Sequence, residues 1–493
     1  MLRQIRHHRS RACRPLRRDI LLCLLSAGLL CLSFSPINAG FAAWVALVPW
    51  LSAIAERSGK QRAALSLLCG FPFFLITLSW VGHVTVIGLL ILCAYLSVYF
   101  ICFGAAASLL SKPCARTLLL LAGFWTALEY FRSTYIWGGF GWALLGYSQY
   151  RNLSLIQCAD IVGVWGVSFL IVFFNLTLYA VWRALERKQP FSHMFSSVAL
   201  PLLISTILLA DAYTYGQSRL GRAFPCPEVT ISVVQPNIAQ EEKWSGWAAD
   251  RIVQRHIFLS RQAARENPDL IIWPETAVPG YLLDDARFFN AVSGAAESLH
   301  TNLLVGSARE SAGKMPQTYN SAFLINRNGR VVDFYDKIHL VPFGEYIPGR
   351  PFLNFLEQFG IADFTPGTTF TIFPVQTSAG GTVRIGVLIC FEDIFPRLVQ
   401  KFRKEGAEIL VTITNEAWFQ RSDEPQQHLA ISVFRAIENR CWFIRCANTG
   451  ISGFIDSHGR IRGKVEQNGE TLFVDGWKTM RLTDNFLSAP HNF

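Results

Sequence analysis

The stretch GVLICFEDIFP, residues 386–396, decides how this chain is interpreted. An apolar run leads into Cys390, and two acids, Glu392 and Asp393, follow almost at once. Such a run predicts a buried strand, and a cysteine at its end is usually a small core residue. A cysteine beside carboxylates also has the surroundings of a nucleophile, so the stretch raises a question of chemistry as well as of fold.

The composition divides the chain at residues 215–230, YGQSRLGRAFPCPEVT. Of the 493 residues, 51% are hydrophobic, and before this point they come in long runs. After it, strand-like runs, polar turns and amphipathic patterns alternate as in a globular domain. The sequence predicts a basic cytoplasmic arm (1–18), a membrane domain (19–215), a globular C-terminal domain (226–480) and a tail (481–493).

The N-terminal part holds seven apolar runs that predict membrane spans, because a bilayer core about 30 Å thick needs about 20 apolar residues per helix. The runs are residues 20–36, 39–55, 63–82, 84–110, 115–131, 155–182 and 197–214. A cleaved signal peptide is the weaker interpretation of the first run, since six more follow it.

The formal charge of +10 comes largely from the arm and from short loops between the runs. The loops after the second, fourth and sixth runs are basic, and the positive-inside rule places such loops in the cytoplasm. Seven spans then put residue 226 onward outside, which in a bacterium is the periplasmic side of the inner membrane. Loop clusters explain the charge better than a nucleic-acid patch does, so no nucleic-acid partner is expected.

The loop between the fifth and sixth runs, residues 128–152, is rich in Trp, Tyr, Phe and Gly. Two interpretations stay open: an aromatic belt at the membrane surface, or a re-entrant element that shapes an opening for lipid. Trp142 and Tyr147 in this loop, and Trp418 further along the chain, are the candidates for lipid access. Glu129 and Asp160 are weaker candidates, of the kind expected for acids within a membrane.

From residue 229 onward, strand-like and helical patterns alternate, which predicts a layered α/β fold. Helices are expected at about 246–266, 283–299, 394–405 and 425–440. NRNGR (326–330) is a strong hairpin turn signal and DSHGR (456–460) a weaker one. The twelve cysteines form no CxxC pair, the ten histidines form no HExxH cluster, and no nucleotide-binding motif occurs. No metal and no cofactor are therefore expected.

Three predicted strands end near residues that can carry chemistry: Glu275 in IIWPET, Lys337 in DFYDKIHL, and Cys390. A thiol with the ordinary pKa of about 8.5 is mostly protonated at neutral pH and needs a base. A buried carboxylate can take its proton, and a lysine can stabilise the oxyanion of acyl transfer. Each residue also has an ordinary interpretation, as a helix cap, a surface lysine or a core thiol, and spacing alone leaves both open.

WPET, YDKIHLVPFGEYIP and LICFED occur in this order, and together they resemble the Glu-Lys-Cys triad of the nitrilase superfamily. With the N-terminal spans they resemble its membrane-embedded branch, the bacterial apolipoprotein N-acyltransferases. GGFGWALLGYSQY, QPNIAQEEKW, NEAWF and QHLAISVFRAIENR are also similar to that family, and the resemblance extends from the first span to about residue 465. One departure is that the family usually ends in a further transmembrane helix, whereas residues 463–493 hold no apolar run of that length.

The resemblance implies a nitrilase-like αββα sandwich carried on an α-helical transmembrane bundle. It implies Glu275 as general base, Lys337 as oxyanion stabiliser and Cys390 as nucleophile. The residues at supporting positions are Glu345, Glu392, Phe391 and Trp244. Phe391 stands where the family often has tyrosine, and its backbone N–H is expected to be a second oxyanion donor.

The same resemblance implies the reaction. An acyl chain passes from a phospholipid to Cys390 as a thioester, and then to the α-amine of the diacylglyceryl-cysteine at an apolipoprotein N-terminus, on a monomeric enzyme. A membrane-tethered nitrilase or amidase for small amides is the alternative, since it would use the same triad without the aromatic loop. A transporter with a large outer domain is a further alternative, but the predicted spans hold few charges.

Overall fold

The computed structural model describes residues 16–111, 113–187, 194–243, 247–312, 315–347, 349 and 363–483. They form two compact units. The helical unit takes the chain up to Leu128 together with Ser168–Leu209, and the sandwich unit takes Glu129–Val167 and the chain from Ala210 onward. The segment 129–167, which the sequence places at the fifth and sixth spans and the loop between them, therefore groups with the C-terminal part.

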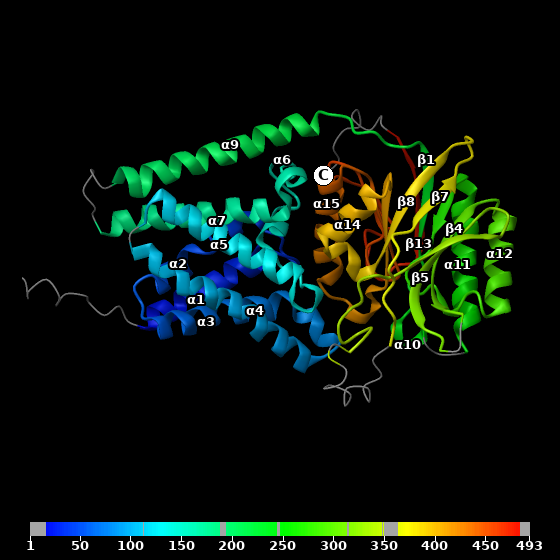
Figure 1. The fold of residues 1–493 in the computed structure, drawn as a ribbon, viewed down its shortest axis with the longest axis horizontal. Coiled ribbons are helices and arrows are strands. Elements are labelled where there is room, and N and C mark those ends of the chain that lie inside the picture. Colours follow the sequence, from blue (N-terminus) through cyan, green and yellow to red (C-terminus); the bar gives the residue numbers. More distant parts are fainter. Residues whose placement is uncertain are drawn as a thin grey trace, which may run out of the picture. The chain divides into compact units, whose positions relative to one another are not determined.

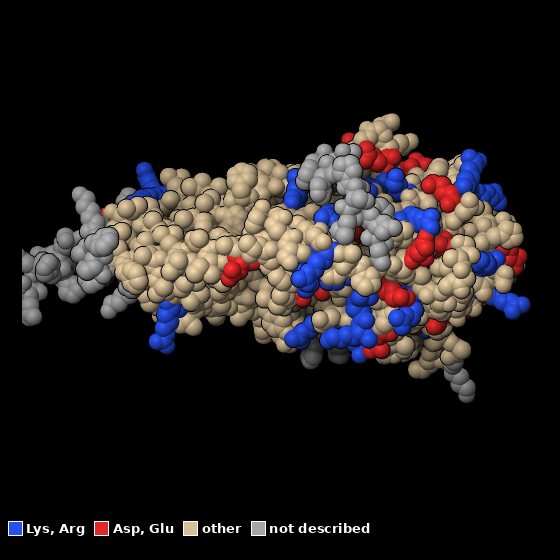
Figure 2. All heavy atoms as spheres, turned by 90° about the horizontal axis from the view of Figure 1, so that it is seen from above, with Lys and Arg blue, Asp and Glu red and all other residues tan. Residues whose placement is uncertain are grey.

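Helices form at all seven predicted spans. They are α1 (Leu16–Leu32), η2 (Gly40–Trp44), α2 (Val48–Ile54), α3 (Gly59–Thr77), η3 (Ser79–His83), α4 (Val86–Ala106), η4 (Ala107–Ser111), α5 (Ala115–Thr134), α6 (Leu153–Ile156), α7 (Ala159–Glu186), η7 (Phe195–Ala199) and α9 (Leu200–Leu220). Charged side chains are sparse over the helical unit on the face drawn in Figure 2 and dense over the sandwich unit.

Three stretches of the described chain are long and apolar enough to cross a membrane: Val86–Ser111, Ala159–Glu186 and Ser197–Leu220. The other helices are shorter or less apolar; α1, for example, has 17 residues. The number of seven spans therefore stays a prediction, with three of the seven meeting the requirements of length and composition.

Polar side chains inside the helical unit are paired between helices. Asn175 of α7 donates to the Ala43 carbonyl and accepts from the Leu47 N–H, both at 2.9 Å. The hydroxyls of Thr177 and Ser205 lie 3.0 Å apart. A lipid-facing environment offers no water to such groups, so pairing of this kind is what a membrane bundle requires.

The sandwich unit contains two sheets. One has the strand order β13-β1-β2-β4-β5-β6, with β3 also paired to β4, and the other has the order β12-β11-β10-β9-β8-β7. The strands are β1 (Val229–Gln235), β2 (Leu270–Ile272), β3 (Val278–Tyr281), β4 (Asn302–Glu310), β5 (Thr318–Ile325), β6 (Val331–Asp336), β7 (Ile372–Gln376), β8 (Thr382–Ile389), β9 (Ile409–Thr414), β10 (Phe443–Ala447), β11 (Gly453–Ile455), β12 (Ile461–Lys464) and β13 (Gly476–Leu482).

Helices cover the outer face of each sheet (Figure 1). α11 (Ala249–Ala263) and α12 (Ala286–Leu299) pack on the first sheet, and α14 (Pro396–Lys404) and α15 (Glu424–Asn439) pack on the second. The two sheets meet through β1 and β10 and through β5 and β8. The predicted αββα sandwich is confirmed, and all four helices form where the sequence predicts them.

The strands that carry the candidate residues end at one edge of the sandwich. β1, β2 and β4 are parallel in the first sheet, and β8, β9 and β10 are parallel in the second. Every residue of β9 is buried, as expected for a parallel strand covered on both faces. Loops at the carboxyl ends of such strands are the usual place for a site in open α/β sheets.

Both predicted hairpin turns are confirmed, since NRNGR joins β5 to β6 and DSHGR joins β11 to β12. In the first turn the Asn326 carboxamide oxygen accepts from the N–H groups of Asn328 and Arg330, both at 3.0 Å. β13 pairs with β1 as far as Leu482, so the sheet runs past the predicted end of the globular C-terminal domain at residue 480. Residues 484–493 lie outside the described chain.

The aromatic loop folds onto the sandwich unit. It forms η5 (Ile136–Gly138) and η6 (Leu145–Gln149), and η6 packs on α15. The Arg132 guanidinium donates to the carbonyls of Phe140, Trp142 and Ala143 at 2.8–3.0 Å. Glu129 accepts from the Leu145 N–H at 3.0 Å. This buried carboxylate thus has a structural partner in the loop.

Asp160 also has structural partners. Its carboxylate accepts from the Tyr215 hydroxyl at 2.9 Å and forms ion pairs with Arg219 at 3.0 Å and Arg440 at 2.7 Å. Three segments that are distant in the sequence meet at this acid. These contacts indicate that Asp160 has a structural role, because it links three segments of the sandwich unit.

Candidate active site

Cys390 lies at the turn between β8 and the short helix η10 (Cys390–Ile394). Its φ of 54° falls in the left-handed region, which a residue other than glycine adopts at an energetic cost. Burial raises the pKa of the thiol well above its ordinary value, and the charge of Glu275 raises it further, while Lys337 and a hydrogen bond with Thr414 lower it. The resting residue is therefore a thiol, and it needs a base before it can attack.

Glu275 follows β2 and is 6% exposed. Its Oε2 accepts from the Asn415 N–H at 2.9 Å, and its Oε1 accepts from Asn320 Nδ2 at 2.8 Å. Lys337 Nζ lies 3.5 Å from the same Oε1. The carboxylate is thus held on both oxygens, as a base of fixed geometry must be.

Lys337 directly follows β6 and is 1% exposed. Its Nζ lies 2.9 Å from both carboxylate oxygens of Glu345. Burial alone would lower the pKa of Lys337, but Glu345, Glu275 and Cys390 outweigh it and the pKa is raised. The side chain is a fixed ammonium, which suits the stabilisation of an oxyanion.

Two further residues of this site were not predicted as site residues from the sequence. Asn320 on β5 donates from Nδ2 to Glu275 and to Glu345, at 2.8 and 2.9 Å, and so sets the spacing of the two acids. Lys243, at the end of α10 (Gln240–Lys243), donates from Nζ to the Glu275 carbonyl at 2.8 Å. Burial lowers the pKa of Lys243 to about 8, although Glu275 and Cys390 act in the opposite direction.

Glu392 ties the cysteine turn to the lysine segment. Its Oε1 accepts from the Tyr335 hydroxyl at 2.7 Å and from the N–H groups of Ile338 and His339 at 2.8 and 3.0 Å. Its Oε2 accepts from the Ile389 N–H at 2.7 Å. Burial raises the pKa of this carboxyl to about 7, against backbone N–H groups and Lys337, which lower it. We expect it to hold Cys390 in place relative to Lys337.

Replacement of Glu392 by glutamine is expected to slow the reaction about 100-fold, because an amide NH₂ would face one of these donors and displace the turn. In the wild type the carboxyl takes up a proton as the pH falls through about 7 and loses acceptor capacity, so the turnover number falls on the acid side. A pH series from 5.5 to 8.5 tests this: the variant should be slow throughout and lack this limb. An unchanged limb in the variant would contradict the assignment.

The other predicted site residues are placed as follows. Phe391 is half-buried, with its ring centroid 5.2 Å from that of Phe395. Trp142 and Tyr147 are 3% and 4% exposed in the aromatic loop, whereas Trp418 on η11 (Glu416–Phe419) is 50% exposed. Trp244 lies outside the described residues. Lipid access past Trp142, Tyr147 and Trp418 stays a prediction.

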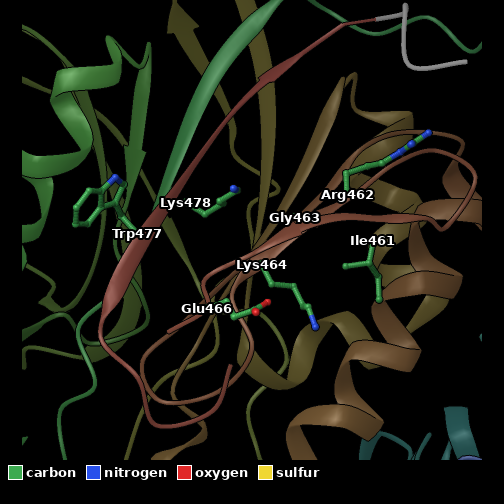
Figure 3. A pocket seen from close by; sticks show the side chains of 7 residues that line it. All are labelled: Ile461, Arg462, Gly463, Lys464, Glu466, Trp477 and Lys478. Atoms are coloured by element: carbon green, nitrogen blue, oxygen red, sulfur yellow. The ribbon is translucent and has the colours of Figure 1, made fainter. Parts of the chain in front are cut away.

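A cavity of about 470 Å³ lies at β12 and β13, at the edges of the two sheets (Figure 3). Its lining residues are Ile461, Arg462, Gly463, Lys464, Glu466, Trp477 and Lys478. None of the three predicted catalytic residues is among them. Because it is lined by none of these three residues, we assign this cavity no part in the reaction.

The sandwich unit is that of the carbon-nitrogen hydrolase class of proteins. Residues 230–476 match the carbon-nitrogen hydrolase family. Among solved structures, an amidase of the nitrilase superfamily from Nesterenkonia AN1 is 17% identical and covers 54% of this chain and 95% of its own, with a TM-score of 0.40. A branch 10 member of that superfamily from Saccharomyces cerevisiae is 19% identical and covers 53% and 92%, also with a TM-score of 0.40.

The N-terminal half makes the assignment specific. Residues 26–177 match the apolipoprotein N-acyltransferase N-terminal domain. Apolipoprotein N-acyltransferases from Geobacter metallireducens and Chlorobaculum tepidum are 39% and 34% identical over 484 and 487 residues, which are 93% and 92% of this chain and 90% and 89% of theirs. One from Brucella melitensis is 32% identical over 513 residues, 96% of this chain and 91% of its own. The chain belongs to the apolipoprotein N-acyltransferase family, which confirms the resemblance seen in the sequence.

Proposed function

We propose that the protein moves an acyl chain from a phospholipid to Cys390, and from there to the α-amine of the diacylglyceryl-cysteine at the N-terminus of an apolipoprotein. The observation that carries the proposal is the ion pair between Lys337 and Glu275, 3.5 Å apart, beside a cysteine in a strained turn. It occurs in a member of a family named for the N-acylation of apolipoproteins.

In the first step Glu275 takes the proton of the Cys390 thiol while Sγ attacks the ester carbonyl of the phospholipid. The negative charge on the carbonyl oxygen is stabilised by the Lys337 ammonium and by the Phe391 N–H. The intermediate then collapses to a thioester. The lysophospholipid leaves as an alcohol, because its oxygen takes the proton back from Glu275.

In the second step the free α-amine of the acceptor attacks the thioester carbonyl. Glu275 receives a proton from the amine and returns one to the departing Cys390 thiolate, so the product is an amide and the enzyme is regenerated. Water would compete with the amine for the thioester. Exclusion of water favours aminolysis, which is a role that we propose for the aromatic loop folded on the sandwich unit.

Family membership and the three long apolar helices make this a membrane protein. We propose that it lies in the bacterial inner membrane, with the sandwich unit on the periplasmic side and the basic loops in the cytoplasm. We propose further that one copy of the chain suffices, because Glu275, Lys337 and Cys390 all come from the same sandwich unit.

The reaction can be tested with purified full-length protein, phospholipid vesicles and a synthetic diacylglyceryl-cysteine peptide. The expected product is a peptide heavier by one amide-linked acyl chain, formed by the wild type and by the control Cys446→Ala, which changes another buried strand cysteine. Hydrolysis of small soluble amides without any triacylated peptide would instead favour the membrane-tethered amidase.

A further inference from the structure

A buried group of charged residues lies directly behind the candidate site. His428 on α15 is 1% exposed and lies between two carboxylates. Its Nε2 is 2.5 Å from Asp393 Oδ1, and its Nδ1 is 2.8 Å from Glu416 Oε1. We call these three residues the histidine bridge. None of them takes part in the steps described above.

The geometry fixes the protonation of the bridge. Each ring nitrogen of His428 faces a carboxylate oxygen, and a carboxylate only accepts hydrogen bonds. A neutral imidazole would direct one lone pair at a carboxylate, whereas an imidazolium donates to both. Burial would lower the pKa of His428, but the charge of Asp393 and hydrogen bonds to both acids raise it to about 9.

The two ends of the bridge belong to the two halves of the candidate site. Asp393 lies in η10, the helical turn that begins at Cys390. Glu416 directly follows Asn415, whose N–H donates to Glu275 Oε2 at 2.9 Å. One cation therefore holds both the turn that carries the nucleophile and the loop that orients the base.

We propose that His428, as an imidazolium, is a positioning residue that fixes the Cys390 thiol relative to the Glu275 carboxylate by bridging Asp393 and Glu416. The proposal rests on the roles of Cys390 and Glu275 in the proposed function. It places the residue that aligns them on α15, the helix that also covers the second sheet and contacts η6 of the aromatic loop.

The remaining neighbours of His428 support this arrangement. Arg445 of β10 donates to Glu416 Oε1 at 2.5 Å and to the Ser432 hydroxyl at 2.6 Å, and that hydroxyl donates to Asp393 Oδ2 at 2.7 Å. Glu424 Oε1 lies 3.5 Å from His428 Nδ1, and burial together with the charge of Glu416 raises its pKa well above the ordinary value. With Glu424 neutral, two cations balance the acids Asp393 and Glu416.

A metal ion is the competing occupant. Glu416, Glu424 and His428 each place one ligand-type atom within 4.8 Å of the others. However, His428 and Arg445 both already donate to the same oxygen of Glu416. Cationic donors thus occupy the place that a metal would take, so an ion-pair network is the better account.

The test measures the alkylation rate of Cys390 by iodoacetamide in full-length protein, by peptide mass spectrometry, with the half-buried Cys226 as internal reference. His458→Gln is the matched control, because His458 is also a buried histidine. Its Nε2 faces the Arg222 carbonyl at 2.8 Å, and its ring contacts the ring of Phe224. His428→Gln is expected to slow alkylation about 100-fold and His458→Gln less than about threefold. No lipid is needed, so a failure of the proposed acyl transfer would not affect the result.

A purely structural histidine would lower the unfolding temperature of His428→Gln and leave its Cys390 alkylation at the wild-type rate, and this outcome would overturn the proposal. Loss of Cys390 reactivity in wild type treated with EDTA would also overturn it, in favour of a metal. Where His428→Gln does not fold, Ser432→Ala removes one donor to Asp393 and is expected to slow alkylation about tenfold. An unchanged rate in Ser432→Ala would contradict the bridge.

A kinetic comparison provides the second readout. In the acyl-transfer assay, His428→Gln is expected to lower the turnover number about 100-fold with KM for the phospholipid within about threefold, because alignment and not substrate binding is lost. Adding Asp393→Asn to His428→Gln is expected to cost little more, since both changes break the same bridge. Full additivity of the two losses would contradict the proposed coupling.

Discussion

Replacing Glu275 by glutamine is expected to slow thioester formation on Cys390 about 1,000-fold. Glutamine keeps the size of the side chain and can still accept from the Asn415 N–H, which lies 2.9 Å from Oε2. It cannot take the proton of a thiol whose pKa lies well above its ordinary value. The rate is measured in a single turnover, by intact mass after mixing with phospholipid vesicles.

Glu266→Gln is the matched control for this change. Glu266 lies in the same unit and accepts from Trp477 Nε1 at 3.0 Å, and it forms no hydrogen bond or ion pair with the candidate-site residues that the structure describes. The control is expected to react at the wild-type rate. A rate for Glu275→Gln within about tenfold of wild type would rule out Glu275 as the base.

Replacing Lys337 by methionine is expected to lower turnover about 1,000-fold, because the oxyanion loses its ammonium partner. The same change leaves the buried Glu275 and the half-buried Glu345 next to each other without their shared cation. Since Lys337 is 1% exposed, the free energy of unfolding should also fall, by about 3 kcal/mol. Turnover and the unfolding temperature in detergent are measured on the same preparation.

A second substitution separates the two effects of losing Lys337. Adding Glu345→Gln to Lys337→Met removes one of the two unpaired acids, so the unfolding temperature should recover in part. Turnover should not recover, because no cation has returned to the oxyanion. Recovery of both together would mean that Lys337 serves stability alone.

Much of the candidate site could be predicted because its residues lie at strand ends. A parallel strand has a short apolar pattern with a clear end, and the carboxyl ends of such strands meet at one edge of the fold. Glu275 and Cys390 each follow a parallel strand that the sequence predicted, and Lys337 follows a predicted strand, β6, that pairs antiparallel with β5. The signal for the β5–β6 turn was also local, since Asn326 accepts from backbone N–H groups within the turn and Gly329 supplies its positive φ.

Asn320 and Lys243 could not be placed in the same way. Asn320 directly precedes the predicted strand run SAFLIN and has no chemical signal of its own in the sequence, and only the folded chain places it between Glu275 and Glu345. Lys243 ends a short charged helix, QEEK, which has the pattern of a solvated surface. In the folded chain Lys243 is buried, and its Nζ donates to the Glu275 carbonyl, which is 32 residues away in the sequence.

The aromatic loop shows the same limit on a larger scale. Its composition fits a membrane surface, and nothing local shows which unit it packs against. The partners that decide this come late in the chain: the Tyr147 hydroxyl accepts from Arg435 at 3.0 Å, and the Trp142 ring lies 5.4 Å from that of His428. The segment 129–167 therefore joins the sandwich unit through residues almost 300 positions away.

The most direct test of this account is the intact mass of purified protein after incubation with phospholipid vesicles, for wild type, Cys390→Ala and the control Cys446→Ala. Wild type and Cys446→Ala are expected to gain one acyl-chain mass that hydroxylamine removes, as a thioester requires, and Cys390→Ala is expected to gain none. A hydroxylamine-labile adduct on Cys390→Ala, or no adduct on folded wild type, would contradict the assignment of Cys390 as the acylated nucleophile.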